Sequence, residues 1–408
     1  MKVQTVMVRF TLPNNMKDII LDEELKKLKY VNDKEINVLK KLNERNELLI
    51  VLLQERLHSL LSEYLNTPFV LSHIRSRQLS SLNHFICKNY LPDRLITIKE
   101  LPTIIMEGYK FFVSILLDNN IDTTRHTTDI NIIEKQYYLG RKKILRIIDY
   151  CKHNFKPYIL EMFIHGSCSD LKLTGFSDID TFVIIKNEIV FNTEKLFKFK
   201  KVWQSSLKYI YKFDSLQHHT HMFAIENELM FYPYHRLPPQ IVKTSKAIIG
   251  THTLVFNAYK YQELIFRSFL QLSQRFRSNK IQFKTYNEFT LKNDISVMNL
   301  FPALYLQSLN YDINKEEAFI HNKVIRHDTN GIFTLLSKVR LEWETSLLSK
   351  VILSIYYNYF IRVFYLKFII IKIGNSLLTE DSKFKENILF DFNRVINGMS
   401  DEIVDALS

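Results

Sequence analysis

Two carboxylates one residue apart, Asp178 and Asp180, follow a Gly166-Ser167 pair after a ten-residue spacer. The apolar residues around each motif predict two short strands. Residues i and i+2 of a strand point to the same side, so both carboxylates would face one cation. Magnesium is usually held by one or two carboxylates together with substrate phosphates. Glycine lets the backbone approach a phosphate, and serine adds a hydroxyl donor, so the spacing predicts metal-assisted phosphoryl or nucleotidyl transfer.

The stretch 163–185 resembles the signature of the polymerase-beta-like nucleotidyltransferase superfamily. In that signature a hydrophobic residue precedes Gly and then Gly or Ser, and Asp-hydrophobic-Asp follows a short spacer. The matching residues, with Thr181 less apolar than the pattern, are Gly166, Ser167, Gly175, Ser177, Asp178, Ile179 and Asp180. The alternative is a surface hairpin loop whose aspartates only cap the backbone or are hydrated.

The resemblance implies an enzyme that transfers a nucleoside monophosphate from a nucleoside triphosphate such as ATP to an acceptor hydroxyl, with release of pyrophosphate. Asp178 and Asp180 would hold Mg²⁺ or Mn²⁺. Gly166 and Ser167 would position the β- and γ-phosphates, with Ser177 beside the nucleotide. The acceptor would be a small molecule, a sugar or a protein.

The resemblance also implies a third metal ligand near the start of the strand that follows the Asp-x-Asp strand, and the sequence leaves three alternatives. Asp214 stands at the entrance of that strand and is one candidate ligand. His219 or His221, predicted to share one strand face, would replace it and favour manganese, iron or zinc over magnesium. A histidine there would also serve as a general base. In the third alternative the site binds nucleotide without turnover.

Basic residues after this strand are candidates for holding a triphosphate. Arg236, Lys243 and Lys246 lie on either side of the Pro238-Pro239 pair. Lysine offers a compact charge for phosphate and arginine a bidentate fork. Each of these residues would equally serve as an ordinary surface charge.

The predicted fold class is α+β: a nucleotidyltransferase-like mixed sheet with helices, flanked by all-helical regions. The expected domains are 1–154, helical, 155–250, the α/β core, and 251–408, helical. Within the core we expect a helix over 193–211 and strands over 160–165, 180–186, 217–225 and 229–232.

Composition limits the classes of protein to which the chain belongs. Its 408 residues carry a net charge of +12, which attracts polyanions, although the lysines are scattered as in lysine-rich codon usage. Three cysteines far apart argue against a zinc site or a disulfide framework. No signal peptide is evident at residues 1–10, so a cytoplasmic location is expected. The apolar stretch 351–373 contains Arg362, Lys367 and Lys372, which favours a buried helix over a transmembrane span.

Two other functions remain open. The core would be a degenerate nucleotide-binding or partner-binding module if the third ligand is absent. Alternatively the acceptor is the end of an RNA or DNA strand, but without a recognisable RNA-binding motif in the sequence a nucleic-acid partner is not favoured.

Overall fold

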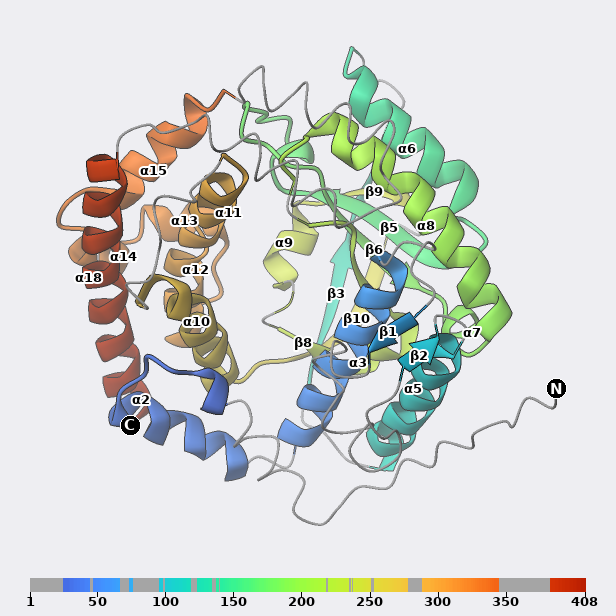
Figure 1. Cartoon of the computed structure of the whole chain (residues 1–408), viewed down its shortest axis with the longest axis horizontal. Helices are drawn as coiled ribbons and strands as arrows, with labels where there is room; N and C mark the ends of the chain where they lie inside the picture. Colours follow the sequence, from blue (N-terminus) through green and yellow to red (C-terminus); the bar gives the residue numbers. More distant parts are fainter. Residues whose placement is uncertain are drawn as a thin grey trace.

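The computed structural model describes most of the chain, and Figure 1 shows its course. The described residues are 25–44, 47–66, 73–75, 95–97, 100–118, 123–133, 137–138, 140–217, 219–234, 236, 238–250, 253–277, 288–344 and 382–408. Helices and strands both contribute, so the predicted α+β class is confirmed.

A mixed five-stranded sheet forms the centre of the α/β part. Strand β5 pairs antiparallel with β6 and β9, whereas β6 pairs parallel with β7 and β9 with β4. The strands in sheet order are β4 (Asn131–Ile132), β9 (Lys246–Ile249), β5 (Ile159–His165), β6 (Asp180–Ile185) and β7 (Met222–Ile225). Nearly every residue of β5 and β6 is buried, as expected for strands covered on both faces.

Two smaller sheets accompany it. One has the order β3 (Thr124–Asp129), β10 (Thr253–Tyr259), β8 (Tyr232–Pro233), and the other pairs β1 (His73–Arg75) with β2 (Leu95–Thr97). Because β1 to β4 precede residue 155, the prediction of an all-helical N-terminal region is wrong. The predicted helical region 251–408 likewise begins with a strand, β10. Strands β3 and β4 are stabilised by partners more than 100 residues later, which local periodicity does not reveal.

Helices cover the large sheet. Helix α8 (Thr193–Phe213) buries Leu196, Phe199, Trp203 and Ile210, which recur at helical spacing. The helices packed around it are α3 (Leu48–Asn66), α5 (Leu101–Asp118), α6 (Lys142–Asn154) and α7 (Asn187–Val190). Short helices complete this part, namely the 3₁₀ turns Gly166–Cys168 and Glu226–Met230 and α9 (Pro239–Lys243).

From Gln262 onward every described element is a helix, and these helices gather on the side opposite α6 and α8 (Figure 1). They are α10 (Gln262–Arg277), α11 (Glu288–Met298), α12 (Phe301–Ser308), α13 (Lys315–Phe319), α14 (Asn322–His327), α15 (Ile332–Leu341) and α18 (Ser382–Leu407). Helix α2 (Asp33–Lys40), followed by the 3₁₀ turn Lys41–Glu44, joins this group, because buried Glu35 pairs with Arg277 at 2.9 Å.

The element predictions for the core were partly correct. The helix from 193 and the strands near 160–165 and 180–186 are confirmed. The predicted strand 217–225 begins only at Met222, and the predicted strand 229–232 is mostly a 3₁₀ turn followed by the two residues of β8. The stretch 351–373 lies outside the described residues. None of the helices described is both long and apolar enough to cross a membrane.

Glu402 of α18 provides a pH-dependent tie between helices. Burial tends to raise the pKa of Glu402, but hydrogen bonds from Lys323, Tyr305 and His327 outweigh burial and lower the pKa to about 2. The ordinary glutamate pKa is about 4.3. The stabilisation is therefore complete above about pH 4.3 and is lost as the pH falls towards about 2.

We expect Glu402→Gln to lower the free energy of unfolding by about 1–2 kcal/mol near neutral pH, after allowance for partial exposure. In urea titrations the difference from wild type should shrink steadily below about pH 4. Asp401→Asn, an exposed neighbour on the same helix, is the control. A difference that stays constant with pH would contradict this role.

Candidate active site

Strand β5 delivers the Gly-Ser turn to the edge of the candidate site. His165 ends the strand opposite Asp180 of β6, and Gly166 follows with φ +66°. A Cβ atom at Gly166 would lie 2.8 Å from Oδ2 of Asp180. Glycine is therefore required at position 166 for two reasons, the left-handed backbone and the close approach of the Asp180 carboxylate.

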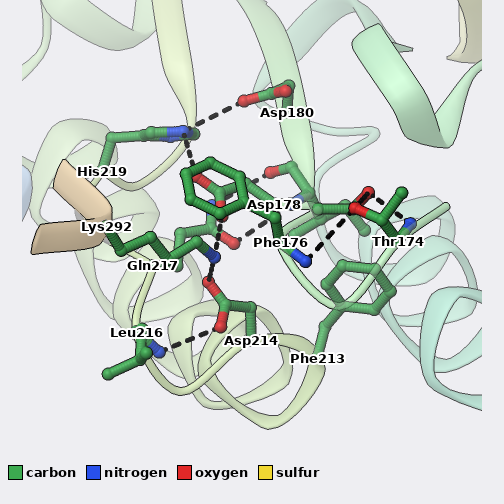
Figure 2. A network of polar contacts seen from close by, with 12 residues as sticks. Thr174, Phe176, Asp178, Asp180, Phe213, Asp214, Leu216, Gln217, His219 and Lys292 are labelled. Atoms are coloured by element: carbon green, nitrogen blue, oxygen red, sulfur yellow. Dashed lines mark hydrogen bonds and ion pairs between the residues drawn. The ribbon is translucent and has the colours of Figure 1, made fainter. Parts of the chain in front are cut away.

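The two carboxylates converge on one imidazole. Nε2 of His219 lies 3.0 Å from Oδ1 of Asp180 and 3.6 Å from Oδ2 of Asp178 (Figure 2). Asp180 is the first residue of β6, whereas Asp178 lies in the loop before it. Gln217 fixes the peptide between them, since its side-chain amide accepts from Ile179 N at 3.2 Å and donates to Ile179 O at 3.0 Å. The predicted convergence is present, but a clamped loop produces it rather than a regular strand.

A buried ammonium group links this pair to Asp214. Nζ of Lys292, on α11, donates to Oδ1 of Asp178 at 2.5 Å and to Oδ2 of Asp214 at 2.6 Å (Figure 2). The Lys292 side chain is 0% exposed, so its charge is compensated by these carboxylates instead of water. The other oxygen of Asp214 accepts from Leu216 N at 3.0 Å. Lys292 thus stands between Asp178 and Asp214.

The charges of the site follow from these contacts. Burial opposes ionisation of Asp178 and Asp180, but hydrogen bonds and charge from His219, with Lys292 beside Asp178, lower the pKa of both carboxyls. Burial also opposes protonation of His219, yet the two carboxylates raise the pKa of this imidazole well above its usual value. Burial raises the pKa of Asp214 to about 6, although Lys292 acts in the opposite direction. At neutral pH the site therefore holds an imidazolium between two carboxylates.

Two further cations approach from the helical region. Burial, with the charge of Arg340, lowers the pKa of Lys315 to about 8, while Asp180 and Asp178 act to raise it. Phe176, in the loop before Asp178, has Lys292 Nζ 5.1 Å and the Arg340 guanidinium 5.4 Å from its ring centre. Lys315 and Arg340 therefore face the aspartate pair with positive charge.

His221 lies elsewhere. Its ring accepts or donates at 2.6 Å to Thr181 Oγ1 and at 2.8 Å to Ser206 Oγ, inside the core between β6 and α8. Burial lowers the pKa of His221 to about 3, so it is neutral. The prediction that His219 and His221 share a strand face is wrong, because residues 219–221 precede β7 and follow an irregular path.

The side chains that were predicted to contact a nucleotide lie in different surroundings. Ser167 is half-buried in the turn after β5, and Ser177 Oγ accepts from Thr174 N at 2.9 Å, shaping the loop before Asp178. Lys246 of β9 points its ammonium to the Tyr137 ring at 5.4 Å, and Lys243 is exposed at the end of α9.

Arg236, the other predicted phosphate ligand, pairs with the buried Glu228 at 3.2 Å and donates to Gln54 O. That ion pair engages its guanidinium within the fold. Arg236 is therefore a poor candidate for holding a phosphate.

The donor set fits a cation held by two carboxylates. Asp178 and Asp180 turn oxygens to one point, now taken by His219 Nε2, and hard cations prefer such oxygens. Within the described ranges, no group of three or more His, Cys, Asp or Glu side chains is arranged to hold a metal ion. Asp214 shares the ammonium of Lys292 with Asp178, and the neighbouring carboxylate of Asp178 helps to raise the pKa of Asp214.

Sequence reasoning missed four residues of this site: Gln217, Lys292, Lys315 and Arg340. Lys292 is 114 residues from Asp178, and its sequence surroundings are those of any helix. Gln217 is the first residue of the predicted strand 217–225, but nothing in the sequence marks an amide that clamps a backbone. Comparison with protein-family models, with curated proteins and with solved structures found no match to this chain.

Removal of the buried ammonium should be costly. We expect Lys292→Met to lower the free energy of unfolding by about 3–5 kcal/mol, because two buried carboxylates lose their counter-ion. Adding Asp214→Asn should restore part of the loss, so that the double change costs less than the sum of the two single changes in urea titrations.

Lys110→Met is the control for this cycle, because Lys110 forms an exposed pair with Glu107 at 3.0 Å and should change stability by at most about 1 kcal/mol. Strict additivity of Lys292→Met and Asp214→Asn would show that the ammonium does not couple these elements.

Gly166→Ala should lower the free energy of unfolding by more than backbone strain alone would. Gly331 has the same φ of +66° but nothing within 4 Å of an added Cβ. We expect Gly331→Ala to cost about 1–2 kcal/mol. Gly166→Ala should cost more, since Asp180 must also move, and equal losses in unfolding titrations would contradict the close approach.

Proposed function

We propose that this chain is a metal-dependent nucleotidyltransferase of the polymerase-beta-like type. It would transfer a nucleoside monophosphate from a nucleoside triphosphate to an acceptor hydroxyl and release pyrophosphate. The observation that carries the proposal is the convergence of Asp178 and Asp180 on one point beside the positive-φ turn at Gly166. A sugar, a small molecule or a protein would supply the hydroxyl.

The proposed role of each residue in the site follows from its charge. Asp178 and Asp180 would hold Mg²⁺ or Mn²⁺, and such an ion neutralises phosphate charge and acidifies the acceptor hydroxyl when bound. Ser167 and the backbone at Gly166 would contact the β- and γ-phosphates. Lys315 and Arg340 add positive charge opposite the aspartates, which suits the negative charge of a triphosphate.

Proton transfer from the acceptor is better assigned to Asp214 than to His219. A general base works best when its pKa lies near the working pH. Burial brings the pKa of Asp214 to about 6, whereas two carboxylates keep His219 protonated. His219 would instead stabilise the carboxylates until a cation takes its place.

A second candidate is a nucleotide-binding module without turnover. The observation that favours it is the internal neutralisation of the site: Lys292 and His219 already occupy the charged oxygens of Asp178. In that case the site would bind a nucleotide through Lys315 and Arg340 and would hold no metal.

A pyrophosphate-release assay tests the proposal. Purified protein is given each of the four nucleoside triphosphates with Mg²⁺ or Mn²⁺ and with candidate acceptors. Asp178→Ala and Asp180→Ala should each reduce release about a thousandfold or more, because a metal contributes several kcal/mol to the transition state. Asp170→Ala, on an exposed loop and paired with Lys172, is the control and should release pyrophosphate at the wild-type rate.

The outcomes separate the candidates. Release that requires both aspartates supports the transferase. Nucleotide binding in calorimetry without release, unchanged by Mg²⁺, supports the module. Release that persists in both aspartate variants would refute the assigned site.

A further inference from the structure

A concentration of basic side chains lies on the outer surface of α6 and α8, away from the helical region. The basic face comprises Lys142 and Arg146 of α6 and Lys201, Lys208 and Lys212 of α8, all exposed. Together the two helices contain ten lysines and arginines but only two acidic residues. Of these ten, Lys200 is buried and Lys195 and Lys198 pair with glutamates, so the basic face consists of exposed side chains outside those pairs.

The two helices lie side by side (Figure 1). Tyr150 of α6 donates to Val202 O of α8 at 3.1 Å, and its ring lies 5.0 Å from that of Tyr209. Lys143 donates to Phe213 O at 3.4 Å, so the start of α6 meets the end of α8. The next residue along the chain is Asp214, so the end of α8 leads into the candidate active site.

These charges are not neutralised locally. Glu194, the acidic residue of α8, pairs with Lys198 at 2.6 Å and leaves the basic face unpaired. Within the part of the chain that the structure describes, no ion pair involves the five side chains of the basic face. Helix α6 also begins without an acidic residue or a side-chain cap, although a helix N-terminus favours negative charge. The positive charges of the basic face repel one another, and binding of a polyanion relieves this repulsion.

Aromatic rings are interleaved with the charges. The Lys201 ammonium lies 4.8 Å from the centre of the Phe197 ring, and that of Lys208 lies 4.8 Å from the centre of Tyr209. Both rings are half-buried. Positive charge combined with aromatic rings is the means by which proteins bind unpaired strands, through phosphate contacts and base stacking.

We propose that the basic face binds single-stranded nucleic acid. From Lys201 to Lys212 it extends about 16 Å along α8, enough for several phosphates. An anionic membrane is the weaker fit, because no large apolar side chain of α6 or α8 is exposed for insertion. The proposal is independent of nucleotidyl transfer, since it involves neither Asp178 nor Asp180.

Fluorescence anisotropy with a labelled single-stranded RNA of about 20 nucleotides tests whether the basic face binds nucleic acid. The titrations are made without nucleoside triphosphate and over a range of salt concentrations. We expect the triple variant K201Q/K208Q/K212Q to bind roughly 30-fold more weakly near 0.1 M salt, with the slope of log affinity against log salt reduced by about 2. The double variant K142Q/R146Q should reduce the slope by about 1.

The charge-matched control is K29Q/K34Q/K40Q, which removes three exposed lysines in and before α2, at the opposite corner of the molecule. Urea unfolding verifies that each variant is folded. Pyrophosphate release by the triple variant is measured as well, and weaker RNA binding whether or not release occurs separates this result from the fate of the transferase proposal. Equal losses in the triple variant and its control would overturn the proposal. So would binding to phosphatidylserine vesicles without binding to RNA.

Discussion

The ammonium of Lys292 joins the two halves of this protein electrostatically. It is fully buried, comes from the helical region, and reaches Asp178 and Asp214, which flank the central sheet. An ion in such a position is tolerated only when charged partners and hydrogen bonds replace water. The helical region and the α/β core therefore cannot separate at this point without exposing or stranding a charge. This constraint fixes the position of the loop that carries Asp178.

The same constraint explains why a loop can hold Asp178 of the candidate site in place. Phe176 is packed by Trp343 at 5.3 Å, and an added Cβ at Gly175 would lie 2.0 Å from Trp343 O, so the helical region presses on the loop before Asp178. Gln217 holds the following peptide from the other side. Positioning by elements distant in sequence gives the aspartates a defined geometry without extending strand β6.

The parts of this arrangement that were predictable are those with local causes. The buried strands around Gly166 and Asp180 and the amphipathic helix α8 follow from residue patterns that one element alone explains. The strand predicted before Met222 fails because Gln217 and His221 satisfy their polar groups through distant residues, Ile179 and Ser206. Lys292 was unpredictable for the same reason, since only tertiary contact distinguishes it from other helical lysines. The aspartates and His219 could thus be named from the sequence, whereas the amide of Gln217 and the cations Lys292, Lys315 and Arg340 could not.

These counter-ions determine the conditions under which a metal cation can bind between Asp178 and Asp180. The point on which Asp178 and Asp180 converge is filled by an imidazolium, which carries one positive charge. A divalent ion that replaces His219 adds charge to a site where Lys292, Lys315 and Arg340 already supply three further positive groups. Such an excess is unfavourable in a poorly hydrated environment unless anions arrive as well. A triphosphate brings that negative charge, so metal and nucleotide are expected to bind together rather than one after the other. Under the proposed function, the side chains of the site neutralise one another until both ligands bind.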